Sequence, residues 1–248
     1  LQEWNRQEGS VMRTTSVITG LASLFSYPDK EYNARAESAL SQMQQFYPEA
    51  TEALARFCSN LPQLTGENAD QNLLDLQELY SRSFEVQPIT TLDVGYVCFG
   101  DDYKRGELMV NLIRVERELG IDPGTELADH LPTVLRLMSV WQDIEMVEEL
   151  VQQIVWPALD SMIAEFDARR IRQRDLLYKR FQKTVLDVSP DRMTMYLDLL
   201  KAVRDVLACE FTKVEPFKPA QSYDFLKSVR QEFEVEDAGA GRRPSADL

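Results

Sequence analysis

Hydrophobic residues recur with the period of an α-helix along most of this chain, and this pattern restricts the chain to a helical fold. The first stripe ends at Tyr27-Pro28. Further stripes of this kind predict helices over 29–46, 48–61, 67–83, 101–119, 134–141, 143–166, 168–187 and 190–212. Only 10 glycines and 11 prolines interrupt the 248 residues. The sequence therefore predicts an all-α fold, a single-domain helical bundle of about 9–11 helices.

Two parts of the chain depart from the helical period. The segment near 84–100 contains Pro88, two threonines and scattered valines, and it is predicted to be extended or looped. Beyond Lys213 the sequence turns polar, with a short predicted helix at 224–234 and a Gly/Ala-rich end. We therefore expect an all-helical domain over 1–213 and a polar, partly mobile tail over 214–248.

The chain is strongly acidic, with 27 basic and 41 acidic side chains and a net charge of −14. Such a charge repels phosphate backbones, so a nucleic-acid partner is not expected. The densest basic run, Arg169 to Arg180, is interrupted by Asp175 and is spaced like a solvent-exposed helix face. An acidic surface favours basic partners, such as positively charged peptides.

His130 is the only histidine, which excludes zinc sites rich in histidine and di-iron sites built on two Glu-x-x-His pairs. Cys58, Cys98 and Cys209 are far apart in the sequence, so no Cys-x-x-Cys pair exists. We expect no metal and no cofactor, and three reduced thiols of a cytoplasmic protein. The longest stretch without charge, 14–28, is too short to span a membrane.

Catalytic motifs are incomplete in this sequence. Asp101-Asp102 begins like a magnesium-binding Asp-Asp-x-x-Asp motif, but Arg105 occupies the last position. Asp129 precedes His130, which reverses the order used by metal-dependent phosphohydrolases, and no phosphate-binding glycine loop is present. We therefore do not expect an enzyme, and a helical enzyme that works with carboxylates alone remains the alternative.

Three motifs follow one another between Leu76 and Trp141. The first two are Glu78-Leu-Tyr-x-x-x-Phe-Glu85 and Asp101-Asp-Tyr-Lys-Arg-Gly-Glu-Leu-Met-Val-Asn-Leu112, and the third is Glu126-Leu-Ala-Asp-His-Leu-Pro132. In this order and spacing they resemble the nitrate reductase delta-subunit (NarJ) family, within the TorD/DmsD redox-enzyme maturation chaperones. The resemblance covers roughly 65 residues well and the first 75 loosely.

The resemblance implies a non-catalytic, all-helical cytoplasmic chaperone. Members of this family bind the N-terminal peptide of a molybdoenzyme catalytic subunit until its molybdenum cofactor and iron–sulfur cluster are inserted. Their peptide-binding region lies around the Asp-His-Leu-Pro hinge and neighbouring helices. By position, the implied peptide-binding residues are Glu126, Asp129, His130, Leu131 and Pro132, with Tyr80, Phe84 and Arg105 in the flanking motifs.

Asp102 is expected to join this site as one of the acidic groups that meet basic residues of the peptide. Ala128 stands where proline is common in the family, so the resemblance leaves the client open between nitrate reductase and nitrite oxidoreductase types. We expect a monomer, with a dimer as the alternative.

Each of these residues also has a purely structural interpretation. Asp129 is placed to cap a helix and Pro132 to start one, while His130 suits a neutral, hydrogen-bonded helix terminus. Arg105 is placed to pair with Asp101 or Asp102 within one helix. The aromatic pair Tyr80 and Phe84 has the spacing of core residues.

A second class of function also fits an acidic helical chain, an adaptor that binds phosphopeptides. Such a protein needs converging arginine and tyrosine side chains to hold the phosphate, and no motif in this sequence predicts them.

Overall fold

The computed structural model describes residues 15–122, 124–182 and 193–211, and these ranges fold as a single all-α unit without a strand. The first helix covers residues 15–23. The next helices are α2 (Tyr32–Phe46), α3 (Glu52–Asn60), α4 (Ala69–Phe84), α5 (Val94–Phe99), α6 (Tyr103–Glu118) and α7 (Leu131–Val140). The remaining helices are α8 (Ile144–Leu150), α9 (Trp156–Glu165), α10 (Ala168–Gln182) and α11 (Met195–Glu210). The predicted helix at 224–234 and the predicted tail at 214–248 lie outside the described residues.

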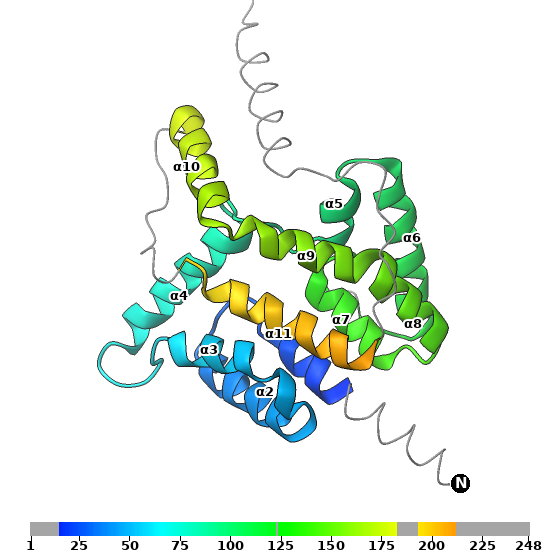
Figure 1. The fold of residues 1–248 in the computed structure, drawn as a ribbon, viewed down its shortest axis with the longest axis horizontal. Coiled ribbons are helices and arrows are strands. Elements are labelled where there is room, and N and C mark those ends of the chain that lie inside the picture. Colours follow the sequence, from blue (N-terminus) through cyan, green and yellow to red (C-terminus); the bar gives the residue numbers. More distant parts are fainter. Residues whose placement is uncertain (1–14, 123, 183–192, 212–248) are drawn as a thin grey trace, which may run out of the picture.

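Helix α11 occupies the middle of the bundle (Figure 1). It packs against α3 on one side and against α9 on the other, and α9 in turn contacts α5. Half of the residues of α11 are buried, and they are almost all apolar: Met195, Tyr196, Leu199, Leu200, Ala202, Val203, Val206 and Leu207. Removing this apolar stripe from water supplies most of the free energy that packs α11 between α3 and α9.

An aromatic cluster joins α11 to α3 and α4. The ring of Tyr196 lies 5.8 Å from that of Phe57, 5.8 Å from that of Tyr80 and 5.0 Å from that of Phe84. The rings meet edge to face or tilted, which is the favourable arrangement for aromatic quadrupoles. The prediction that Tyr80 and Phe84 are core residues is therefore confirmed.

Helices α8 and α9 form one rod, linked by the π-helix η2 (Val151–Val155). Pro157 lies in the first turn of α9. A proline removes one backbone hydrogen bond, and a π turn is a common way to accommodate this loss within a continuous helix. In the described part of the chain, no helix is long and apolar enough to cross a membrane.

The segment 84–100 was expected to be irregular, and this prediction is wrong for its last part, which forms α5. Val94, Val97 and Cys98 of α5 are buried, and the helix packs against α9. A helix of 6 residues is too short for a helical period to show in the sequence. By contrast, the predicted end of α6 at Gly120 is confirmed, because this glycine has the left-handed φ of 67° typical of a helix terminator.

Candidate functional site

The start of α7 is joined to the segment before α5 by two backbone hydrogen bonds. The amide of Val94 donates to the carbonyl of Asp129 at 2.8 Å, and the amide of Leu131 donates to the carbonyl of Leu92 at 2.8 Å. Between them, Asp93 and His130 face each other as an isolated antiparallel bridge. This short pairing brings together two segments that α5 and α6 separate in the sequence.

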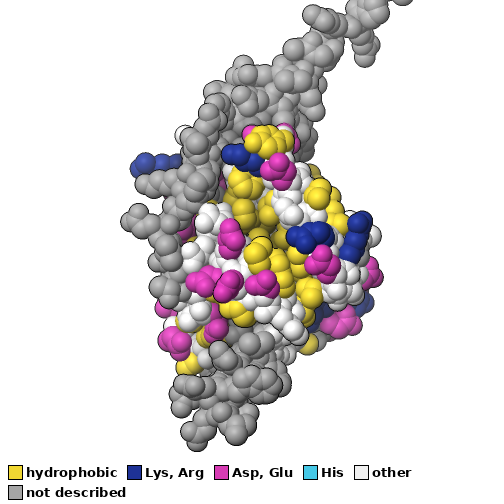
Figure 2. All heavy atoms as spheres, turned by 90° about the vertical axis from the view of Figure 1, so that its right-hand side faces the viewer, with side chains coloured by type: hydrophobic (Ala, Val, Ile, Leu, Met, Phe, Trp, Pro, Cys, Tyr) yellow, Lys and Arg dark blue, Asp and Glu magenta, His cyan; other side chains and the backbone are white. Residues whose placement is uncertain are grey.

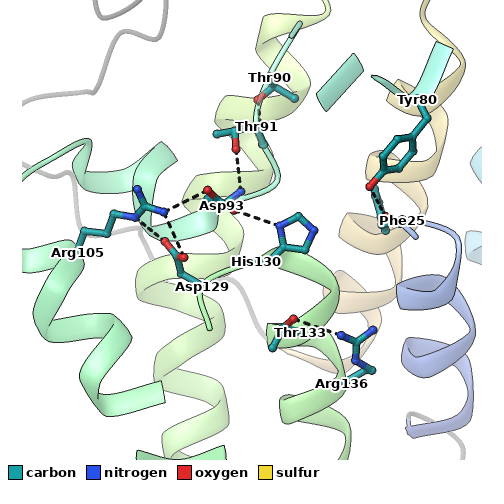
Figure 3. A network of polar contacts seen from close by, with 10 residues as sticks. All are labelled: Phe25, Tyr80, Thr90, Thr91, Asp93, Arg105, Asp129, His130, Thr133 and Arg136. Atoms are coloured by element: carbon teal, nitrogen blue, oxygen red, sulfur yellow. Dashed lines mark hydrogen bonds and ion pairs between the residues drawn. The ribbon is translucent and has the colours of Figure 1, made fainter. Parts of the chain in front are cut away.

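An ion pair at this junction holds α6 against α7 (Figure 3). The carboxylate of Asp129 is fully buried. It accepts hydrogen bonds from Arg105, at 2.8 Å from Nε and 3.3 Å from Nη2. Burial alone would lower the pKa of Arg105, but the hydrogen bond and charge of Asp129 raise it, with a further contribution from Asp93. Two hydrogen bonds to one carboxylate are the strong, geometrically specific form of such a pair.

Asp93 completes the arrangement, because its two oxygens contact different partners. Oδ2 lies 3.1 Å from Nη2 of Arg105, and Oδ1 lies 3.1 Å from Nδ1 of His130. We call Asp93, Arg105, Asp129 and His130 the hinge network. With His130 neutral, it contains two carboxylates and one cation, so it has an excess of negative charge.

Two structural interpretations of these residues are corrected by this geometry. Asp129 does not cap α7, because His130 is the N-cap residue and the Asp129 carboxylate is directed to Arg105 instead. Arg105 does not pair with Asp101 or Asp102, because its guanidinium contacts Asp129 and Asp93. The interpretation of His130 as a hydrogen-bonded helix terminus is confirmed.

Because Gly95 has no side chain, it leaves space for the buried carboxylate of Asp129. A Cβ atom on this residue would lie 2.6 Å from Oδ2 of Asp129, too close for any side chain. Neither Gly95 nor Asp93 was among the predicted site residues. The signal for them was a glycine and a carboxylate inside the otherwise apolar segment from Leu92 to Phe99, which periodicity alone does not interpret.

The other predicted residues lie in different environments. Asp102 is the N-cap of α6, and its carboxylate accepts a hydrogen bond from the amide of Lys104 at 3.0 Å. Leu131 and Pro132 are buried in the first turn of α7, as expected for a helix-starting proline. Glu126 is exposed.

Tyr80 connects the aromatic core to the surface near Glu126. Its hydroxyl donates to the carbonyl of Phe25 at 2.8 Å, and its ring meets the half-exposed ring of Tyr27 at a centroid distance of 5.5 Å. Burial raises the pKa of Tyr80, and the nearby charges of Glu85 and Glu126 raise it further. We call Tyr27, Tyr80, Glu85 and Glu126 the acidic–aromatic patch.

Arginine and tyrosine side chains do converge elsewhere, between α4 and α10. Arg82 lies over the ring of Tyr178, with 5.9 Å between its guanidinium carbon and the ring centroid. Arg82 pairs with Asp175, and Arg174 pairs with Glu165, which also pairs with Arg170. Both Arg82 and Arg174 are fully buried. Because carboxylates of the chain already bind them, these guanidinium groups do not form an open phosphate site.

Burial raises the pKa of the cysteine thiols. Burial raises the pKa of Cys58 to about 11, with a contribution from Glu37, and that of Cys98 to about 12. Thiols with such pKa values are poor nucleophiles at neutral pH. Among the described residues, no group of three or more His, Cys, Asp or Glu side chains could hold a metal ion.

A cavity of about 450 Å³ lies beside the last turns of α11. It is lined by Trp156, Arg204, Asp205, Ala208, Cys209, Glu210 and Phe211. This set includes none of the residues predicted to bind a peptide.

The fold and the site define a helical protein whose distinctive feature is a partly exposed, anionic junction between two inter-helix segments. No protein-family model matches this chain, and no curated protein matches it either.

Proposed function

We propose that this chain is an assembly chaperone that binds the N-terminal peptide of a molybdoenzyme catalytic subunit, of the nitrate reductase or nitrite oxidoreductase type. It holds this peptide in the cytoplasm until the molybdenum cofactor and the iron–sulfur cluster are inserted, and it catalyses no reaction. The single observation that carries the proposal is the meeting of Arg105 with Asp129 at 2.8 Å.

This contact supports the proposal because it joins two of the motifs on which the family resemblance rests. Arg105 comes from the Arg-Gly motif at the start of α6, and Asp129 comes from the Asp-His-Leu-Pro motif at the start of α7. The two residues are 24 positions apart in the sequence. Residues of two consecutive motifs therefore meet at one place in the fold, instead of each capping its own helix.

The geometry suggests separate roles for the acidic residues. Asp129 is fully buried and bound by Arg105, so we assign it the role of holding α6 and α7 together. Asp93 is 24% exposed in its side chain, and Glu126 is exposed. These two carboxylates are therefore the ones that a lysine or arginine of the client peptide would meet. His130, 15% exposed, follows Glu126 in the same motif and shares a hydrogen bond with Asp93.

Apolar contacts would come from exposed side chains near these carboxylates. Tyr27 is 50% exposed in the acidic–aromatic patch, and Leu127, next to Glu126, is 47% exposed. A leader peptide that folds as an amphipathic helix presents one apolar face and one basic face, and such a surface matches both. Ordering the peptide costs conformational entropy, so the affinity would be modest, which suits a client that must later be released.

Isothermal titration calorimetry of the full chain tests this function. The ligands are synthetic N-terminal peptides of molybdoenzyme catalytic subunits encoded beside it, each with a scrambled and a phosphorylated version. We expect one leader to bind with a Kd of about 1–50 μM, as is typical of coupled folding and binding. Binding should depend on salt concentration, because charge pairs contribute to it.

Two variants locate the site in the same experiment. Asp93→Asn and Glu126→Gln should each weaken binding about fivefold to tenfold, because each removes one partner of a basic residue. Glu118→Gln, which removes an exposed carboxylate from the other end of α6, is the matched control and should leave the Kd unchanged. If no leader binds, the proposed function is wrong. If only phosphorylated peptides bind, the adaptor function replaces it.

A further inference from the structure

The outward face of α10 is a basic stripe that the proposed function does not use. Ile171, Arg174 and Tyr178 on this helix are buried. On the exposed side, Arg169, Arg172, Leu176 and Lys179 follow one another at helical spacing, and Leu176 is 68% exposed. The stripe therefore consists of three cations around one exposed leucine, and α10 projects from the body of the molecule (Figure 1).

These three cations lack acidic partners within the described part of the chain. Among residues 15–122, 124–182 and 193–211, no ion pair forms at Arg169, Arg172 or Lys179, although several other exposed arginines are paired, such as Arg56 with Glu52 and Arg114 with Glu118. In a chain with a net charge of −14, three unpaired cations on one helix face are an unusual concentration of positive charge. They form a surface that fits an acidic partner.

A surface of the opposite kind lies at the start of α8. Ile144 and Met146 are 55% and 42% exposed, and Glu145 and Glu149 beside them are exposed as well. Neither glutamate forms an ion pair within the described residues. Figure 2 shows this side of the molecule, where hydrophobic side chains form a run across the surface with acidic side chains grouped next to it.

We propose that the basic stripe of α10 binds the acidic start of α8 on a second copy of this chain. The two surfaces lie at opposite ends of the α8–α9 rod, so they cannot meet within one molecule (Figure 1). A two-fold axis across the rod places α10 of each copy on α8 of the other, and the contact is made twice. Ser161 and Ala164, which are exposed on α9 between the two ends, are small and allow the rods to approach.

This chain carries both halves of the contact, which favours a second copy over a foreign acidic protein. The stripe of α10 and the start of α8 each combine charged side chains with exposed apolar side chains. The charges of these two surfaces have opposite signs. The hinge network takes no part in it, so this proposal and the proposed function can fail independently.

Sedimentation equilibrium of the full chain tests the proposal through charge reversal. The unmodified protein should dimerise, and higher salt should weaken the dimer. Arg169→Glu with Arg172→Glu, or Glu145→Lys with Glu149→Lys, should each weaken dimerisation about tenfold or more, because like charges then face each other at both contacts. An equimolar mixture of these two double variants should restore the dimer, because both contacts then pair opposite charges.

The mixture also shows that neither variant is simply misfolded. Lys104→Glu, which reverses an exposed cation on α6, is the control and should dimerise like the unmodified protein. A chain that is monomeric at all concentrations and salt conditions would overturn the proposal and leave the stripe to an acidic partner of another kind. A dimer that both double variants form as well as the unmodified protein would also overturn it.

Discussion

Two ion networks in the described part of this protein differ in the sign of their excess charge. The hinge network sets two carboxylates around Arg105, whereas the network between α4 and α10 sets Arg82, Arg170 and Arg174 around Glu165 and Asp175. Arg82 and Arg174 are fully buried, while Arg105, Asp93 and His130 keep 15–24% of their side chains exposed.

This difference indicates that the network between α4 and α10 is structural, whereas the hinge network is able to bind a basic ligand. Burial lowers the pKa of Arg174, and the charge of Glu165 opposes this effect. The charged form of Arg174 is therefore stabilised by a carboxylate of the chain itself. The hinge network keeps carboxylate oxygens near solvent and has negative charge to spare. A basic ligand could therefore bind the carboxylates between α4 and α10 only by breaking their ion pairs. It could bind the exposed carboxylate oxygens of the hinge network without breaking any ion pair.

The largest effect is expected from Glu165→Gln. This change removes the negative charge of Glu165 from the fully buried Arg174, and breaking a buried pair in this way destabilises a protein by about 3–5 kcal/mol. Urea denaturation followed by circular dichroism measures the free energy of unfolding. Glu118→Gln, from an ion pair whose side chains are about 60% exposed, is the matched control and should change it by less than about 0.5 kcal/mol. Equal effects of the two changes would contradict the structural role of the α4–α10 network.

Gly95→Ala tests how tightly the hinge network is packed. The added Cβ would lie 2.6 Å from Oδ2 of Asp129, so the carboxylate or the helix must move, at a cost of about 1–3 kcal/mol. Gly106→Ala on α6 is the control, because its Cβ meets nothing within 4 Å. In a helix this change should stabilise the protein by about 0.5–1 kcal/mol. Thermal unfolding would reveal the opposite signs, and a neutral Gly95→Ala would show that the junction is loose.

Asp129→Asn sharpens the comparison by breaking the hinge network itself. Arg105 would lose its closest anionic partner but would keep Asp93 and access to solvent, so the expected loss is smaller than for Glu165→Gln, about 1–3 kcal/mol. The free energy of unfolding in urea is again the measurement. A loss as large as that of Glu165→Gln would mean that the hinge network is a buried joint of the same kind.

Glu116 is a third case, a buried carboxylate that accepts no hydrogen bond from any described residue. Burial raises its pKa above the usual 4.5, and the charge of Arg136 opposes this effect. The folded protein therefore binds this proton more tightly than the unfolded chain does. The contribution of Glu116 to stability is greatest below pH 4.5 and is lost as the pH rises through its raised folded-state pKa.

Glu116→Gln should therefore stabilise the protein at pH 7, by about 1 kcal/mol, and change little at pH 4. Thermal melts at the two pH values measure this difference, with the exposed Glu107→Gln as control. Equal effects of Glu116→Gln at both pH values would show that its carboxylate is not buried in solution.

Long amphipathic helices were predictable from the sequence, and so were the core positions of Tyr80 and Phe84. Helix α5 was not, because a helix of 6 residues carries too little periodicity. Of the site, the motifs identified Arg105, Asp129 and His130, but not which partner each side chain would choose. Aspartate is a common capping residue, and Asp129 lies just before α7. Only the tertiary pairing of 92–94 with 129–131 directs its carboxylate to Arg105. Asp93 lies within that pairing and Gly95 directly follows it, and local sequence does not encode the pairing.

The central claim is that the region around the hinge network binds a leader peptide, and hydrogen–deuterium exchange tests it most directly. Exchange of backbone amides would be compared with and without a saturating leader peptide, using a scrambled peptide as control. We predict slower exchange over 92–94, 126–132 and the first turn of α6, with no change in α2 and α3. Protection confined to other helices, or the same protection by the scrambled peptide, would contradict the claim.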